Sequence, residues 1–316
     1  MTTNKELHVI LGTGPVGITL ADELLAKGKQ VRLVNRSGKG QIPVGAELAA
    51  ADVMKSEVVR DLCREASVVY HCANVSYDQQ VASMPQMQAS ILTGLTDSNA
   101  RLIVTDTLYM YGETHGKVMT EETPFAATTR KGKLRAQLAN NYLQAHRDGR
   151  VRVALGRAAD FFGPRVLNSS LGDRVFPAAL SGKPIQLLGN IDLLHGYSYI
   201  VDVAKCLVVL GEHEEALGRA WHVPVVTPAV TQRAMADQIA MVLGKPVRIQ
   251  KMPKVAIQSF GLVNSFMREF VEMFYQYQEP QIVDASAIEQ AFGLRATPLH
   301  EAMGATIDWY RTQEQV

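Results

Sequence analysis

The stretch "LGTGPVG" (residues 11–17) decides the fold. An apolar, strand-like run comes directly before it, and a helix-like stretch follows. Its glycines have the spacing Gly-x-Gly-x-x-Gly, which in this context is typical of a dinucleotide-binding loop. Gly12 would allow the tight turn, Gly14 would let backbone N–H groups approach a pyrophosphate, and Gly17 would let the helix pack closely on the strand. The alternative is a βα turn that uses glycine for geometry alone.

The helix that follows supports the first interpretation. Pro15 and Val16 fall in its first turn, where the missing N–H of proline costs little and its φ is already suitable. The N-terminus of a helix directs positive partial charge at a phosphate. We therefore expect Pro15 and Val16, together with the three glycines, to lie against the cofactor.

The end of the second strand, "LVNRSG" (residues 33–38), indicates which dinucleotide is bound. An Asp or Glu here would accept hydrogen bonds from a ribose and would repel a 2′-phosphate. This chain instead has the neutral Asn35, followed by Arg36, with Ser37 and Lys39 nearby. Arg36 could pair with a 2′-phosphate through charge-assisted hydrogen bonds, so the sequence favours NADP over NAD. The alternative for Arg36 is a solvated surface charge.

The composition excludes several classes of protein. The chain has 316 residues, of which 47% are hydrophobic, and its 32 Lys and Arg nearly balance 31 Asp and Glu. It has no basic block of the kind that binds nucleic acid or an anionic membrane, and no window reaches the roughly 18 apolar residues of a membrane helix. The three cysteines show no CxxC spacing. We expect a reduced, cytoplasmic protein with a small-molecule partner.

Short β-rich runs alternate with helical patterns along the first half of the chain. This alternation, with strands that read as continuous Val/Ile/Leu runs, predicts a parallel sheet covered by helices on both faces. The fold class is therefore α/β, a Rossmann-type doubly wound parallel sheet with a smaller C-terminal substrate lobe. We assign residues 1–165 to the dinucleotide-binding domain, with 197–226 returning to it, and residues 166–196 and 227–316 to the substrate-binding lobe.

Five further stretches carry a family resemblance. They are "VVYHCAN" (68–74), "TDTLYMYG" (105–112), "RAADFFGPR" (157–165), "YSYIVDVAKCL" (197–207) and the C-terminal "VDASAIEQAFGLRATPLHEAMGATIDWY" (283–310). Across nearly the whole chain the sequence resembles an extended short-chain dehydrogenase/reductase of the epimerase/dehydratase group, and more closely its atypical members. The resemblance implies cofactor contacts at Ala73 and at Asp52, although Asp52 also suits an ordinary turn.

The same resemblance implies a catalytic Ser or Thr, a Tyr and a Lys, with the last two spaced Tyr-x-x-x-Lys. Thr107 and Lys133 match two of these positions, and a strand-end threonine bonded to backbone is the alternative for Thr107. Thr129 stands where the tyrosine is expected, and no tyrosine of the chain is followed by Lys at the fourth position. A threonine hydroxyl is a far weaker acid than a phenol and cannot simply take over proton transfer.

Three explanations for the missing tyrosine remain open. Tyr109, Tyr111 or Asp106 could supply the proton, the substrate or water could do so, or the protein could bind the nucleotide without turnover. We take Tyr111, with Thr107 and Lys133, as the candidate catalytic set.

The family pattern is also altered elsewhere. Leu11 stands where the extended family has its first glycine, and Asp160 and Phe162 replace the usual Asn and Tyr. Asp160 is either a pocket carboxylate or a loop-capping side chain.

The sequence thus predicts an NADP(H)-binding oxidoreductase or epimerase/dehydratase-like enzyme, with NAD(H) as the other cofactor, that acts on a hydroxyl or carbonyl of a small molecule. The alternative is a non-catalytic NAD(P)-binding protein that senses redox state. His71 and Cys72 are adjacent, but no third ligand stands at a suitable spacing, so no metal site is predicted. By analogy alone, the resemblance allows a homodimer.

Overall fold

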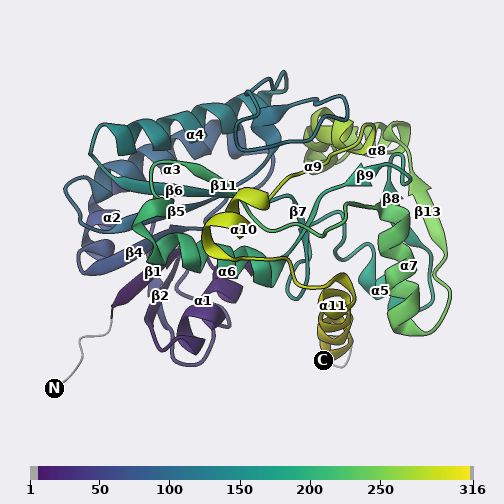
Figure 1. Ribbon diagram of the computed structural model, residues 1–316, viewed down its shortest axis with the longest axis horizontal. Helices are drawn as coiled ribbons and strands as arrows, with labels where there is room; N and C mark the ends of the chain where they lie inside the picture. The colour runs from purple at the N-terminus through teal and green to yellow at the C-terminus, as the bar shows by residue number, and fades with distance from the viewer. Residues whose placement is uncertain (1–5, 314–316) are drawn as a thin grey trace. The chain divides into compact units, whose positions relative to one another are not determined.

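The chain divides into two compact units (Figure 1), and the computed structural model describes residues 6–313. The first unit holds residues 6–107, 133–157 and 203–221, and the second holds 108–132, 158–202 and the residues from His222 onward. Residues 108–132, 158–165, 197–202 and 222–226, which we assign by sequence to the dinucleotide-binding domain, fall in the second unit. The assignment of one lobe to the nucleotide and the other to the substrate stays a prediction.

A seven-stranded sheet forms the centre of the first unit, in the order β11-β6-β5-β4-β1-β2-β3. The strands are β1 (Leu7–Leu11), β2 (Gln30–Asn35), β3 (Glu47–Ala50), β4 (Ala66–His71), β5 (Arg101–Asp106), β6 (Arg152–Arg157) and β11 (Ala220–His222). Every pairing from β3 across to β6 is parallel. The order reverses beside β1, which is the topological switch point of a doubly wound fold. The predicted Rossmann-type fold class is confirmed.

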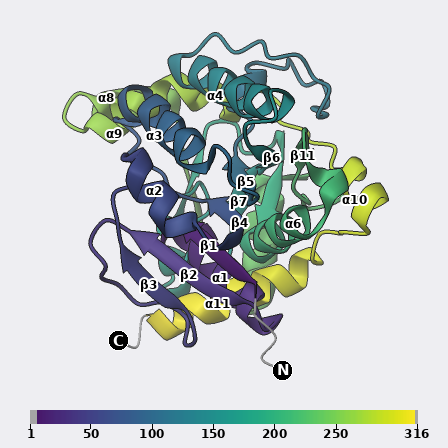
Figure 2. The same ribbon diagram turned by 90° about the vertical axis from the view of Figure 1, so that its left-hand side faces the viewer.

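Helices cover both faces of this sheet, as Figure 2 shows, with α1 and α6 on one face and α2, α3 and α4 on the other. They are α1 (Pro15–Ala26), α2 (Ser56–Cys63), α3 (Gln80–Leu95), α4 (Arg130–Arg147) and α6 (Ile200–Glu212), with the short 3-10 helix η2 (Glu214–Ala216) after α6. The central strand β1 lies beneath them, and Val9, Ile10 and Leu11 are fully buried. This double coverage explains why the strands read as unbroken apolar runs.

The second unit is built from short elements. Its strands are β7 (Asp160–Phe162), β8 (Ile185–Leu188), β9 (Leu194–His195), β10 (Tyr197–Tyr199), β12 (Val230–Thr231) and β13 (Ile249–Met252). Its helices are η1 (Tyr109–Tyr111), α5 (Phe176–Leu180), α7 (Gln232–Leu243), α8 (Lys254–Gly261), α9 (Ser265–Phe270), η3 (Val271–Tyr277), α10 (Ser286–Phe292) and α11 (Leu299–Gln313). The strands pair two by two, β7 with β10 and β8 with β13 in parallel, and β9 with β12 in antiparallel. Within residues 6–313 no helix is both long enough and apolar enough to span a bilayer.

The turn between β1 and α1 is tightly packed. A Cβ added to Gly17 would lie 2.1 Å from the carbonyl oxygen of Gly12 and 3.3 Å from Cγ2 of Ile10. Gly12 has φ of +115°, and a Cβ there would lie 2.7 Å from the backbone nitrogen of Ala73. The helix can therefore approach the strand this closely only because both positions lack a side chain.

We expect Gly17→Ala to lower the free energy of unfolding by about 1–3 kcal/mol, because the new methyl group meets backbone that cannot move aside. Gly14→Ala is the matched control, since a Cβ at Gly14 meets nothing within 4 Å. Urea denaturation of the two variants and the wild-type chain measures the difference. Equal stability of Gly17→Ala and wild type would contradict the packing described here.

Candidate functional site

The glycine loop lies at the carboxyl end of β1, between the ends of its two neighbouring strands. The backbone N–H of Gly12 donates to the carbonyl oxygen of Val34 on β2 at 2.9 Å, and that of Cys72, just after β4, donates to the carbonyl oxygen of Leu11 at 2.9 Å. Ligands of doubly wound folds bind outside the carboxyl ends of the strands at this switch point. The loop is thus held where a ligand of this fold is expected.

The first turn of α1 is free to bind an anion. Gly14 is the N-cap residue and supplies no side-chain cap, and Pro15 follows in the first turn. The N–H groups of a first helical turn have no partner within the helix, so they are donors for a phosphate. The open space beside Gly14 leaves room for a phosphate to reach them. Val16 is buried at 7% exposure, so it would contribute its backbone rather than its side chain. These residues fit a dinucleotide pyrophosphate.

Asn35 organises the loop that follows β2. Its Nδ2 donates to Oγ1 of Thr13 and to the carbonyl oxygen of Lys39, both at 3.0 Å, and its Oδ1 accepts from the backbone N–H of Gly38 at 2.7 Å. This side chain therefore ties the loop to the glycine turn. Arg36 comes next and is exposed, and in the described part of the chain it has no hydrogen bond or ion pair. Its guanidinium is available to a ligand.

Asp52 and Ala73 occupy different settings. Oδ1 of Asp52 accepts the backbone N–H of Met54 at 3.1 Å, which is the geometry of an Asx turn. The side chain is half-buried after β3. Ala73 presents its backbone to Gly12, as described above. Only Ala73 therefore lies beside the glycine loop by a contact that the structure shows.

Two of the candidate catalytic residues belong to the first unit. Thr107 is half-buried and directly follows β5, and Lys133 is exposed in the first turn of α4. Thr107 follows the carboxyl end of its strand, on the edge where the glycine loop also lies. The third candidate, Tyr111, belongs to the second unit.

The side chain of Tyr111 lies in the core, with 1% exposure. Its hydroxyl lies 2.8 Å from Nε2 of His222, whose Nδ1 lies 2.7 Å from the carbonyl oxygen of Asp284. A carbonyl oxygen can only accept, so Nδ1 carries the proton, and in the neutral ring Nε2 accepts from the phenol. Tyr111 is therefore engaged with an internal imidazole.

Asp106, another candidate proton donor, also has a partner. Its Oδ2 accepts from Nε of Arg157 at 3.2 Å, and both side chains are buried. This ion pair joins the ends of β5 and β6. The carboxylate of Asp106 is therefore engaged by an internal guanidinium.

Thr129, where the sequence resemblance predicts a tyrosine, caps a helix. It precedes α4, and its Oγ1 accepts the backbone N–H of Gly132 at 3.1 Å, three residues along, as an N-cap does. The same hydroxyl donates to Sδ of Met273 at 3.5 Å. The hydroxyl therefore both accepts and donates a hydrogen bond within the protein.

A buried lysine next to this cap was not found by sequence reasoning. Lys131 is fully buried, and its Nζ donates to Glu269 and, at 3.1 Å, to Glu272. Arg130 also donates to Glu269, at 2.9 Å. These hydrogen bonds hold the start of α4 to α9 and η3, and they lower the pKa of Glu269, first through Lys131 and then through Arg130 against the effect of burial.

A second group that the sequence does not reveal surrounds Asp160. Its Oδ2 accepts from Tyr277 at 2.8 Å, Ser170 at 2.9 Å and His195 at 3.1 Å. The interpretation of Asp160 as a loop-capping side chain is wrong, because these three donors are side chains rather than local backbone. They come from η3, a loop and β9, and no sequence spacing links them.

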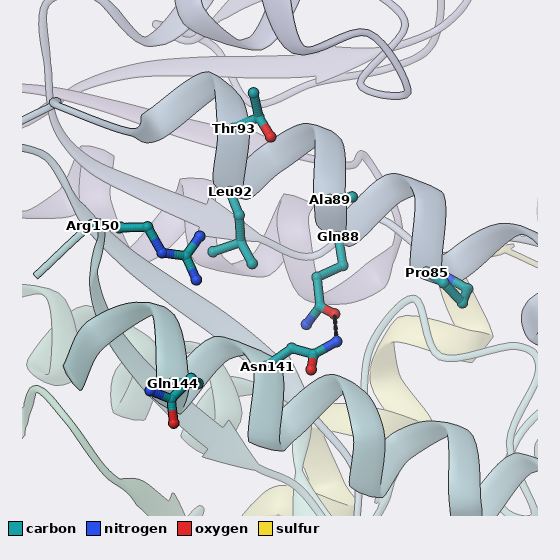
Figure 3. Close-up of a pocket in the computed structure, with 8 residues that line it drawn as sticks. All are labelled: Pro85, Gln88, Ala89, Leu92, Thr93, Asn141, Gln144 and Arg150. Carbon is teal, nitrogen blue, oxygen red and sulfur yellow. Dashed lines mark hydrogen bonds between the residues drawn. The ribbon is translucent and has the colours of Figure 1, made fainter. Parts of the chain in front are cut away.

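One pocket of about 300 Å³ lies elsewhere in the first unit (Figure 3). Residues of α3, α4 and the following loop line it: Pro85, Gln88, Ala89, Leu92, Thr93, Asn141, Gln144 and Arg150. Nδ2 of Asn141 donates to Oε1 of Gln88 at 2.9 Å. Arg150 precedes the amino end of β6, the edge opposite the glycine loop, so we do not place the functional site here. Among residues 6–313 no three His, Cys, Asp or Glu side chains gather as a metal site.

Comparison with solved structures shows the same fold over the full chain. The dTDP-glucose 4,6-dehydratase of Bacillus anthracis in complex with NAD is 15% identical, with a TM-score of 0.79 and 98% of each chain covered. The UDP-glucuronic acid 4-epimerase of Bacillus cereus in complex with NAD is 14% identical, with a TM-score of 0.80, covering 97% of this chain and 99% of that one. The UDP-glucose 4-epimerase of Thermotoga maritima with UDP-glucose is 16% identical, with a TM-score of 0.76, covering 98% and 99%.

No curated protein matches the chain by sequence. The family model described as "NAD dependent epimerase/dehydratase family" matches residues 9–223. That range holds the glycine loop, the whole parallel sheet except its first two residues, and the start of α4. The chain therefore belongs to the NAD-dependent epimerase/dehydratase family.

Proposed function

We propose that this protein is an NADP(H)-dependent enzyme of the epimerase/dehydratase kind that acts on a hydroxyl or carbonyl group of a small molecule. The observation that carries the proposal is the open, uncapped N-terminus of α1, held against β1 by Gly12 and Gly17 at the switch point of the sheet. Two structural neighbours are complexes with NAD, which supports a nicotinamide dinucleotide at the same place in this fold.

The preference for NADP(H) rests on the loop after β2. Asn35 carries no charge, and its amide is hydrogen-bonded within the loop itself. This side chain therefore does not repel a 2′-phosphate. Arg36 is exposed on the same loop, beside the exposed Ser37 and Lys39. A guanidinium binds a phosphate through two parallel hydrogen bonds, which a ribose hydroxyl cannot match.

A bound nicotinamide would supply the hydride chemistry. Thr107 would bind the reacting oxygen of the substrate by a hydrogen bond from Oγ1. Its position directly after β5, at the edge of the sheet where the glycine loop lies, is suitable for this role. Lys133 would place its ammonium beside the ribose hydroxyls and orient them. We assign Tyr111 a positioning role, since its phenol donates to His222 inside the core. The proton would then come from the substrate or from water, or from Tyr109, which is half-buried at the start of η1.

A redox-sensing protein that binds NAD(P) without turnover is the second candidate. It is favoured by the use of Thr129 as a helix cap at the position of the family tyrosine. A sensor of this kind has no evident need for both Thr107 and Lys133, so their effect on turnover separates the two candidates.

We expect wild type to bind NADPH more tightly than NADH, and Arg36→Ala to weaken NADPH binding at least tenfold, or about 1.4 kcal/mol, because a charge-assisted phosphate contact is lost. NADH binding should stay unchanged. A fluorescence titration with each nucleotide measures both affinities. Arg64→Ala, at another exposed arginine of the first unit, is the control. Equal loss of NADH and NADPH binding would refute the selectivity, and binding of neither nucleotide to wild type would refute the proposed function.

Thr107→Val and Lys133→Met should each lower turnover by about 10²-fold or more while the affinity for NADPH stays within a few-fold of wild type. A screen of aldehydes, ketones and alcohols with NADPH or NADP⁺ supplies the substrate for this comparison. Lys117→Ala, at an exposed lysine outside the site, controls for loss of charge. Unchanged turnover in both variants would show that the catalytic assignment is wrong.

Thr129→Val should lower the free energy of unfolding by about 1 kcal/mol, because the N-cap acceptor is lost while the shape of the side chain is kept. Thr129→Ser keeps the hydroxyl and should stay close to wild type. Chemical denaturation of the three proteins measures the difference. A Thr129→Val protein that unfolds at the same denaturant concentration as wild type would mean that the cap contributes nothing.

A further inference from the structure

Asp160 lies on β7 of the second unit and is surrounded by side-chain donors. Tyr277, Ser170 and His195 all donate to its Oδ2. Its side chain nevertheless keeps 22% of its surface exposed. Oδ2 receives all three of the hydrogen bonds that the described residues make to this carboxylate, so Oδ1 receives none of them.

The carboxylate is held in its charged form. Burial alone would raise the pKa of Asp160, but the hydrogen bond and charge of His195, followed by the hydrogen bonds from Tyr277 and Ser170, outweigh burial and hold the pKa below the usual value. Within the described residues no Lys or Arg bonds to Asp160, so its negative charge is not cancelled by a fixed guanidinium or ammonium group. It contrasts in this respect with Asp106, which is paired with Arg157.

A buried phenol without a partner lies next to this carboxylate. Tyr197 on β10 is the register partner of Asp160 across the parallel β7–β10 pair. Its side chain is fully buried, and among residues 6–313 its hydroxyl has no hydrogen-bond partner. Burial, and then the charge of Asp160, raise the pKa of Tyr197 well above its usual value, so the phenol keeps its proton and remains a donor.

Aromatic packing keeps the group rigid. The ring of His195 stacks on Tyr277 at 5.3 Å and lies 4.9 Å from the ring of Tyr197. Two of the three donors, His195 and Tyr277, are thus held in place by ring packing around the Asp160 carboxylate.

We propose that Asp160 and Tyr197 form a binding site for a hydroxyl group of an uncharged or cationic substrate, and that this carboxylate disfavours a ligand that places a phosphate there. A hydroxyl can donate to Oδ1 of Asp160 while it accepts from the Tyr197 phenol, which satisfies both groups. A phosphate carries at least one negative charge at and near neutral pH and is repelled by the carboxylate. This inference rests on the proposed function and narrows its substrate class.

The substrate class differs from what the structural neighbours handle. The Thermotoga maritima epimerase is described with UDP-glucose, and the Bacillus anthracis enzyme is a dTDP-glucose dehydratase. Both ligands carry a diphosphate. A fixed carboxylate in the second unit of this chain favours instead a polyhydroxylated compound without phosphate at this position.

Two sugars of opposite charge test the site: D-glucosamine, protonated at pH 6.5, and D-glucose 1-phosphate. Ligand-observed NMR titration of the NADP⁺-loaded protein should show glucosamine bound at least tenfold more tightly. In Asp160→Asn, glucosamine should bind more weakly and glucose 1-phosphate more tightly. The dissociation constant of glucose 1-phosphate divided by that of glucosamine should therefore fall at least tenfold. Tyr197→Phe should weaken glucosamine binding without strengthening that of the phosphate.

Asp192→Asn is the matched control, because Asp192 is an exposed carboxylate of the same unit, and its ratio should equal that of wild type. A structural defect in Asp160→Asn would weaken both sugars together, so that result overturns the proposal. An unchanged ratio, a wild-type preference for the phosphate, or no measurable binding of glucosamine also overturns it. NADPH titration of the same samples tests the proposed function separately. Normal NADPH binding together with any of these results would refute the Asp160 site but not the proposed function.

Discussion

The close approach of α1 to β1 is the constraint on which the nucleotide site depends. Gly17 lies so near the carbonyl of Gly12 that a single methyl group would not fit, and Gly12 in turn lies against the backbone of Ala73. Three chain segments thus converge on positions without side chains. The helix N-terminus reaches the edge of the sheet only through this packing, and its unpaired N–H groups are what a phosphate binds. The same two glycines therefore serve stability and ligand binding together.

Thr129, where the sequence resemblance predicts a tyrosine, belongs to a network of structural contacts. In this protein the start of α4 is a structural joint: Thr129 caps the helix, and the buried Lys131 is neutralised by Glu269 and Glu272. Removing one partner of such a buried pair would leave an uncompensated charge, which is costly. A proton donor at this point would have to compete with these structural contacts. The exposed Lys133, two residues after Lys131, is not part of this joint.

The fold could be predicted from the sequence because the patterns that indicate it are local. These patterns are the glycine spacing, the unbroken apolar strands and the β-α alternation, and each can be recognised within a short stretch of the chain. Together they predict the doubly wound sheet and the position of the glycine loop. The role of Asp160 could not be foreseen in this way. Its donors lie 10, 35 and 117 residues away along the chain. Tyr111 shows the same limit, because its partner His222 is 111 residues distant, and only packing reveals that its phenol is engaged.

Charge is distributed unequally over the functional groups of the two units. In the first unit an uncapped helix N-terminus and the exposed Arg36 offer positive potential, and Asn35 replaces the carboxylate that would oppose a phosphate there. In the second unit the ionised Asp160 has no Lys or Arg partner among the described residues, and it accepts hydrogen bonds from a phenol, a hydroxyl and an imidazole. Fixed charges of opposite sign discriminate between ligands by repulsion as much as by attraction. A phosphate would be attracted by the first group and repelled by the carboxylate of Asp160, so the two fixed charges would direct a phosphorylated cofactor to the first unit and away from the second.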